Sequence, residues 1–119
     1  MLLLELLVAT GAVALVILVQ VISTYALAWR IRQTLPVWLS NRSTPHILVG
    51  AALPSFAILF LGHIVQVWLW AGLYIWLGEF ADLETALYFS TVTISTLGYG
   101  DIVLSPDWRL LGAIEAASG

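Results

Sequence analysis

The chain has 119 residues, of which 61% are hydrophobic and 9% are charged, with a formal net charge of −3 and no cysteine. Because soluble domains are only about half apolar, this composition indicates an integral membrane protein and excludes an ordinary soluble domain. Without cysteine, a disulfide framework, a thiolate nucleophile and a thiolate metal site are also excluded. The length allows one small domain at most.

The first predicted element is a transmembrane helix within residues 1–28. Leu2 to Ala28 is almost uninterrupted apolar sequence, and a membrane helix needs about 20 such residues, so we place the span at about residues 6–28. A secretory signal would begin with basic residues and have a shorter apolar core. The only early charge is Glu5, so we expect the helix to be retained.

A polar loop is predicted at residues 29–46. It contains three of the four arginines, Arg30, Arg32 and Arg42, and the positive-inside rule places such a loop in the cytoplasm and the N-terminus outside. We interpret these arginines as anchors that orient the chain. For Arg30 and Arg32 the alternatives are a gating charge and a contact with anionic lipid, but a voltage sensor needs a longer series of arginines inside the span.

The next predicted span is an outer helix at residues 47–77. The stretch is longer than a perpendicular crossing requires, which predicts a tilt, an interfacial first turn or a bend near Pro54. Aromatic residues crowd its far end and are typical of an outer aromatic belt. They are Trp68, Trp70, Tyr74 and Trp76.

Polar residues lie inside both predicted spans. His63 and Gln66 are close enough in sequence to share one helical face, and Gln20 on the first helix lies at about the depth of His63. We interpret this set as an interhelical hydrogen bond. A proton-sensing histidine is the alternative, and a metal or haem ligand is the weakest interpretation because partner ligands are missing.

A short helix is predicted at residues 83–94. Asp82 is a typical N-cap, and Glu84 adds early negative charge at the helix start. The helix is too short to cross a membrane, so we expect it to re-enter rather than span. It is followed by the run Thr96-Leu97-Gly98-Tyr99-Gly100-Asp101.

The run from Thr96 to Gly100 is predicted to line a narrow pore with its backbone carbonyls. Such lining requires alternately handed dihedral angles, and Gly98 and Gly100 reach positive φ without a Cβ penalty. With four chains around one axis, four carbonyls of each run would replace the water shell of a potassium ion. They are those of Thr96, Leu97, Gly98 and Tyr99.

Residues 86–101 resemble the pore loop of tetrameric potassium channels, whose filter reads T-V-G-Y-G. Leu97 stands where valine is usual, a mild change because this residue contributes its carbonyl to the ion path. The resemblance implies a homotetramer. It also implies that Tyr88 and Phe89 pack around the filter, with Tyr99 pointing toward them.

Three other positions relate to the same resemblance. Asp101 lies at the outer mouth, where it either supports the filter by a hydrogen bond or raises the local cation concentration. Val92 stands where the family often places a carboxylate or another polar group behind the filter, a difference that bears on inactivation. Gly119 lies near the position of the family's hinge glycine.

The last predicted element is an inner, pore-lining helix at residues 106–119. Ser105, Pro106 and Asp107 are typical of a cap, a first helical residue and an early acid. We expect Glu115 to face the cavity or a neighbouring subunit, because a charge facing lipid is costly. As a helix the segment extends only ~21 Å, short of the roughly 30 Å hydrocarbon core, so we expect either a fragment or completion by partners.

Together these elements predict an all-α membrane protein with a transmembrane helix at 1–28 and a pore domain at 47–119. We interpret the chain as a multi-pass subunit of a potassium channel in the cell membrane that conducts K⁺ passively. The alternatives are a subunit of a potassium uptake transporter and a non-conducting assembly or regulatory protein. No catalytic constellation supports an enzyme. We expect no cofactor besides permeant K⁺, and as partners further copies of the chain and membrane lipid rather than nucleic acid.

Overall fold

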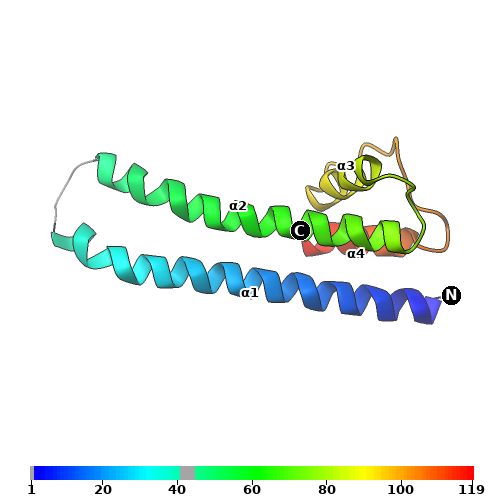
Figure 1. The fold of residues 1–119 in the computed structure, drawn as a ribbon, viewed down its shortest axis with the longest axis horizontal. Coiled ribbons are helices and arrows are strands. Elements are labelled where there is room, and N and C mark those ends of the chain that lie inside the picture. Colours follow the sequence, from blue (N-terminus) through cyan, green and yellow to red (C-terminus); the bar gives the residue numbers. More distant parts are fainter. Residues whose placement is uncertain (1, 41–44) are drawn as a thin grey trace.

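The structure, a computed structural model, describes residues 2–40 and 45–119, which form four helices. They are α1 (Leu2–Ser40), α2 (Pro45–Trp76), α3 (Leu83–Ile94) and α4 (Arg109–Ser118). α1 and α2 run side by side in opposite directions, and α3 and α4 pack where α1 begins and α2 ends (Figure 1). The described residues contain no strand, so the fold is all-α as predicted.

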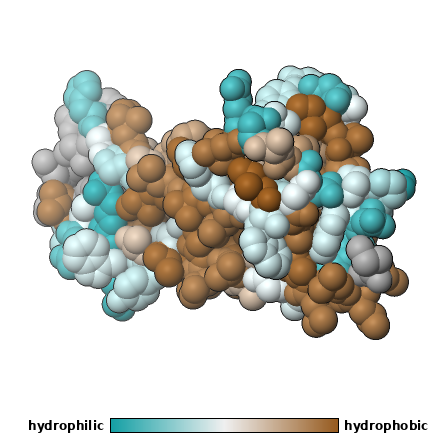
Figure 2. Space-filling view, turned by 45° about the vertical axis from the view of Figure 1, so that its right-hand side comes forward, coloured by the Kyte–Doolittle hydropathy of each residue, from teal (hydrophilic) through white to brown (hydrophobic). Residues whose placement is uncertain are grey.

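Two of the helices have the length and composition of membrane spans. Leu2–Val37 and Val49–Trp76 are long and apolar enough to cross a bilayer. Many of their large apolar side chains are exposed, such as Leu3 and Phe56. Figure 2 shows apolar surface across the middle of the molecule and a mixture of apolar and hydrophilic residues toward its ends. Apolar surface of this extent is unsuited to water, which agrees with the all-α membrane protein predicted from composition.

α1 is longer than the predicted span and continues through most of the predicted loop at 29–46. Arg30 and Arg32 favour helix intrinsically, so the polar composition that suggested a loop does not end the helix. Pro36 removes one backbone hydrogen bond, but it lies close to the helix end. With 39 residues α1 is about 58 Å long, roughly twice the thickness of a hydrocarbon core. Arg42 lies outside the described residues.

α2 covers residues 47–76 of the predicted outer helix at 47–77 and ends in a Schellman motif. The N–H of Glu79 donates to the carbonyl of Tyr74, and the N–H of Gly78 donates to the carbonyl of Ile75, both at 3.0 Å. Gly78 has a φ of 79°, which a residue without a Cβ adopts at little cost. This turn redirects the chain toward α3.

The core lies where the four helices meet, and it contains two of the four residues predicted to form an outer aromatic belt. Trp70 and Tyr74 are buried, whereas Trp68 and Trp76 are exposed. The belt prediction is therefore wrong for Trp70 and Tyr74. Trp70 lies against α1, and Tyr74 lies against α3 and α4. The buried members of the core are Ala9, Val16, Trp70, Tyr74, Phe89, Ile94, Leu104 and Leu111.

The seam between α1 and α2 combines a close approach with a polar pair. Gly62 lies against Ser23, so a Cβ at position 62 would overlap the serine side chain. Next to this contact, Nε2 of Gln66 donates to Oε1 of Gln20 at 3.0 Å. The predicted interhelical hydrogen bond is confirmed, with Gln66 rather than His63 as the partner of Gln20.

Candidate functional site

α3 begins at an acidic cap, as predicted. Asp82 accepts hydrogen bonds from the backbone N–H and the hydroxyl of Thr85, both at 2.8 Å, and these donors lower the pKa of Asp82. The helix has the predicted bounds, Leu83–Ile94. Its 12 residues span about 18 Å, less than the thickness of a hydrocarbon core.

The loop after α3 is anchored by backbone hydrogen bonds to the last turns of that helix. The N–H of Thr96 donates to the carbonyl of Thr93 at 2.9 Å. Leu97 and Gly98 both donate to the carbonyl of Val92, at 3.0 and 3.2 Å. The amide hydrogens at the start of the loop therefore point back toward α3, and Val92 supports the loop through its backbone.

The backbone of this loop alternates in handedness. Thr96, Gly98 and Gly100 have φ angles of 58°, 56° and 76°, whereas Leu97 and Tyr99 between them do not have positive φ. The angles of the two glycines match the prediction. Thr96 is the only non-glycine residue with positive φ in the described ranges, and a β-branched residue there is an outlier that the glycine pattern did not predict.

Only one of the two aromatic residues predicted to pack around the filter lies on that side of α3. The Tyr88 hydroxyl donates to Oδ2 of Asp101 at 2.7 Å, and this bond raises the pKa of Tyr88. Asp101 thus binds α3 beside the loop, and its two predicted roles at an outer mouth stay predictions. Phe89 is instead buried against Phe80, with ring centroids 5.2 Å apart. Neighbouring helical residues point about 100° apart, so Tyr88 faces the loop and Phe89 faces the core.

The segment after the loop is fastened to the end of α2 by Glu79. The N–H and the hydroxyl of Ser105 donate to the two carboxylate oxygens of Glu79, each at 2.7 Å. The prediction that Ser105 caps the inner helix is therefore wrong, because its hydroxyl is engaged elsewhere. Residues 106–108 form a turn, and α4 begins at Arg109. No local signal predicts the bond, since its partners are 26 residues apart.

Glu115 is fully buried within the chain, so the prediction that it faces a cavity or a neighbouring subunit is wrong. The Tyr74 hydroxyl donates to its Oε2 at 2.6 Å, and the Ser90 hydroxyl lies 2.5 Å from its Oε1. The same stripe of α4 buries Leu111 and Gly112. The stripe packs against α3 and α1, and Glu115 reaches Tyr74 of α2 and Ser90 of α3 from it, so its carboxyl group points inward.

Glu5 has a structural role that the sequence does not reveal. Its Oε1 accepts a hydrogen bond from the N–H of Leu111 at 3.2 Å, in the first turn of α4. Unpaired N–H groups and the helix dipole favour a carboxylate at this place. α1 is thereby joined to α4 at the same end of the molecule as the loop (Figure 1).

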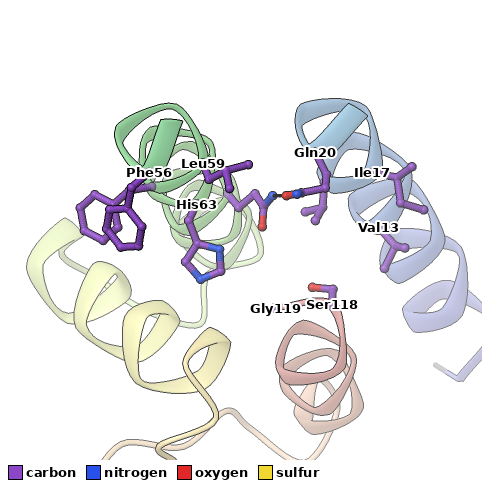
Figure 3. A pocket seen from close by; sticks show the side chains of 11 residues that line it. Val13, Ile17, Gln20, Phe56, Leu59, His63, Ser118 and Gly119 are labelled. Atoms are coloured by element: carbon purple, nitrogen blue, oxygen red, sulfur yellow. Dashed lines mark hydrogen bonds between the residues drawn. The ribbon is translucent and has the colours of Figure 1, made fainter. Parts of the chain in front are cut away.

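A pocket of about 570 Å³ opens between α1, α2 and the end of α4. Gln20 and His63 line it together with Ser118 and Gly119 (Figure 3). Gly119 also lies against Ile94, where a Cβ would overlap the carbonyl of that residue. The proton-sensing interpretation of His63 stays a prediction.

These elements define an all-α membrane protein in which a short capped helix and a glycine loop lie between two other helices. Residues 62–119 match a family model described as an ion channel. The match covers the second half of α2, α3, the loop and α4, and it supports an ion channel pore in this part of the chain. No match was found among curated proteins or among solved structures.

Proposed function

We propose that the chain is a subunit of a potassium-selective channel, in which four copies bring residues 96–100 together on one axis. The observation that carries the proposal is the alternating backbone at Thr96, Gly98 and Gly100. It occurs directly after a short helix and within the region that matches the ion channel family model.

In this proposal the loop binds potassium through backbone oxygen atoms. Rings of carbonyls replace the hydration shell of K⁺ in selectivity filters, and an alternately handed backbone turns successive carbonyls toward the same side. The contributing carbonyls are those of Thr96, Leu97, Gly98 and Tyr99, with the hydroxyl of Thr96 below them. The C-terminal end of α3 adds partial negative charge near the cation path.

Assembly into a tetramer is supported by large side chains of the loop that are exposed in a single chain. Leu97 is 57% exposed and Tyr99 is 65% exposed, although both are large and largely apolar. Neighbouring copies would cover these side chains and enclose the pore. With the filter end of the molecule outside, Arg30 and Arg32 lie toward the opposite end of α1, in agreement with a cytoplasmic placement, and lipid would cover the apolar surfaces of α1 and α2.

The proposal is tested by reconstituting the chain in liposomes and comparing potassium with sodium flux. We expect selective potassium flux from the native chain and its loss in Gly98→Asp, because the substitution puts a side chain and a charge at a residue with positive φ. Gly72→Ala is the matched control. Gly72 lies in α2, and apart from the adjacent backbone of that helix no atom lies within 4 Å of where its Cβ would be, so flux should be retained.

Equal sodium and potassium flux from the native chain would contradict a potassium filter. Selective flux that survives Gly98→Asp would show that ions pass elsewhere. The copy number of the reconstituted protein is a second readout, since four copies favour the channel and one or two copies favour a non-conducting assembly protein.

A further inference from the structure

The carboxyl group of Glu115 is the centre of a buried chain of oxygen atoms that joins α2, α3 and α4. The Tyr74 hydroxyl lies 2.6 Å from Oε2 of Glu115, and Oε1 of Glu115 lies 2.5 Å from the Ser90 hydroxyl. The Ser90 oxygen in turn lies 3.1 Å from the carbonyl oxygen of Val67. Tyr74, Ser90 and Glu115 are each 0% exposed, so these groups satisfy one another rather than bulk water.

The number of available protons decides whether every contact in this row of oxygen atoms is a hydrogen bond. The hydroxyls of Tyr74 and Ser90 supply one proton each, and the Val67 carbonyl supplies none. With an ionised Glu115, two protons serve three contacts, and Ser90 donates either to the carboxylate or to Val67. With a protonated Glu115 every contact has its proton, because Tyr74 donates to Glu115, Glu115 donates to Ser90, and Ser90 donates to Val67.

The charged groups on the surrounding elements do not compensate an ionised Glu115. Among the described residues, α1 contributes the acid Glu5 and the turn after α2 contributes the acid Glu79, each bound elsewhere, and the acid Glu84 on α3 is exposed. Arg109 on α4 is exposed, and His63 on α2 lines the pocket beside the end of α4. A buried carboxylate without a cation is costly, so these surroundings stabilise the neutral acid.

We propose that Glu115 is a neutral carboxylic acid and acts as a positioning residue for the loop at 96–100. Ser90 lies on α3, and α3 anchors the loop through the carbonyl of Val92. A fully ordered chain of hydrogen bonds to Ser90 therefore holds α3 against both α2 and α4. The role of the loop rests on the proposed channel function, whereas the protonation of Glu115 and the link between the helices do not.

Three substitutions distinguish a neutral Glu115 that positions the loop from an ionised Glu115. Glu115→Gln reproduces the neutral acid, because the amide oxygen accepts from Tyr74 and the amide nitrogen donates to Ser90. Glu115→Ala leaves both hydroxyls without this partner. Glu84→Gln is the matched control, since it removes an exposed carboxyl from the first turn of α3.

The experiment compares the full reconstituted chain with each variant by infrared difference spectroscopy, thermal stability and the ratio of potassium to sodium flux. We expect Glu115→Gln to remove the carbonyl band of a protonated carboxylic acid near pH 7, and Glu84→Gln to remove none. Thermal stability and the flux ratio should be retained in Glu115→Gln. Both should fall in Glu115→Ala.

Two results would overturn the proposal. One is an infrared difference between native chain and Glu115→Gln that contains only ionised carboxylate bands. The other is a Glu115→Gln variant as unstable as Glu115→Ala. If the native chain carries no selective potassium flux, the proposed function fails, but the infrared and thermal measurements still decide whether Glu115 is neutral and links the helices.

Discussion

Thr96 has a φ of 58°, a value that β-branched residues rarely adopt. Residues in such sparsely populated regions cost on the order of 1–3 kcal/mol and persist only where their surroundings hold them. Here the N–H of Thr96 is bound by Thr93, and the two following N–H groups are bound by Val92. The sequence predicts left-handed residues at Gly98 and Gly100 from their chemistry, but it cannot predict one at a threonine.

Adding a single methyl group to two glycines tests whether the left-handed backbone is required. Apart from adjacent backbone and chain neighbours, neither Gly100 nor Gly50 has an atom within 4 Å of where a Cβ would lie. Gly100 has a φ of 76°, whereas Gly50 is helical. We expect Gly100→Ala to lower the free energy of unfolding by about 1–2 kcal/mol and Gly50→Ala to raise it by about 0.5–1 kcal/mol. Denaturant unfolding in detergent micelles measures both changes in the free energy of unfolding. Changes of the same sign would show that the fold does not require a left-handed backbone at position 100.

The hydrogen bond from Tyr88 to Asp101 has a defined dependence on pH. Free tyrosine titrates near pH 10, and the pKa of Tyr88 is raised by this bond. The stability that the bond contributes is therefore fully present below about pH 10 and is lost as the pH rises through the higher folded value. We expect Tyr88→Phe to be less stable than the native chain at neutral pH, with a difference that shrinks at strongly alkaline pH.

Thermal unfolding of both chains across this pH range measures that difference. Tyr25→Phe is the control, because Tyr25 is exposed on α1. A difference for Tyr88→Phe that stays constant with pH, or that equals the difference for Tyr25→Phe, would count against the bond.

At the scale of elements, the packing of α1 on α2 depends on the small side chain at position 62. The nearest atom to a Cβ there is Oγ of Ser23, and overpacking typically costs about 1–3 kcal/mol. We expect Gly62→Ala to destabilise the chain, and to do so less when Ser23 is also replaced by alanine. Unfolding of the two single variants and the double variant gives the coupling between the positions. Strictly additive effects would contradict the close contact.

Helices set by local signals were predictable, and helix ends set by distant partners were not. The Asp82 cap and the glycine loop gave the bounds of α3, and apolar length gave the residues of α2. The start of α4 was misplaced because Ser105 is bound by Glu79. Polar composition at residues 29–40 predicts a loop, but α1 continues to Ser40 because arginine is a good helix former.

At the scale of the whole molecule, the polar contacts that organise the candidate pore come from acids distant in sequence. Glu5, Glu79 and Glu115 reach Leu111, Ser105 and Tyr74 respectively. Sequence patterns predict which residues share a helical face, but they do not predict which faces meet. The residues of the filter run were predictable because their chemistry is local, whereas the buried supports depend on tertiary packing.

The bond between Glu5 and Leu111 joins residues 106 positions apart, and this separation has a consequence for synthesis on the ribosome. Glu5 enters the translocation machinery long before α4 exists, so during insertion its carboxyl group has no N–H of α4 to bind. Long-range contacts of this kind form late in folding. A nascent chain that ends before Leu111 therefore lacks the backbone N–H that Glu5 binds in the folded protein.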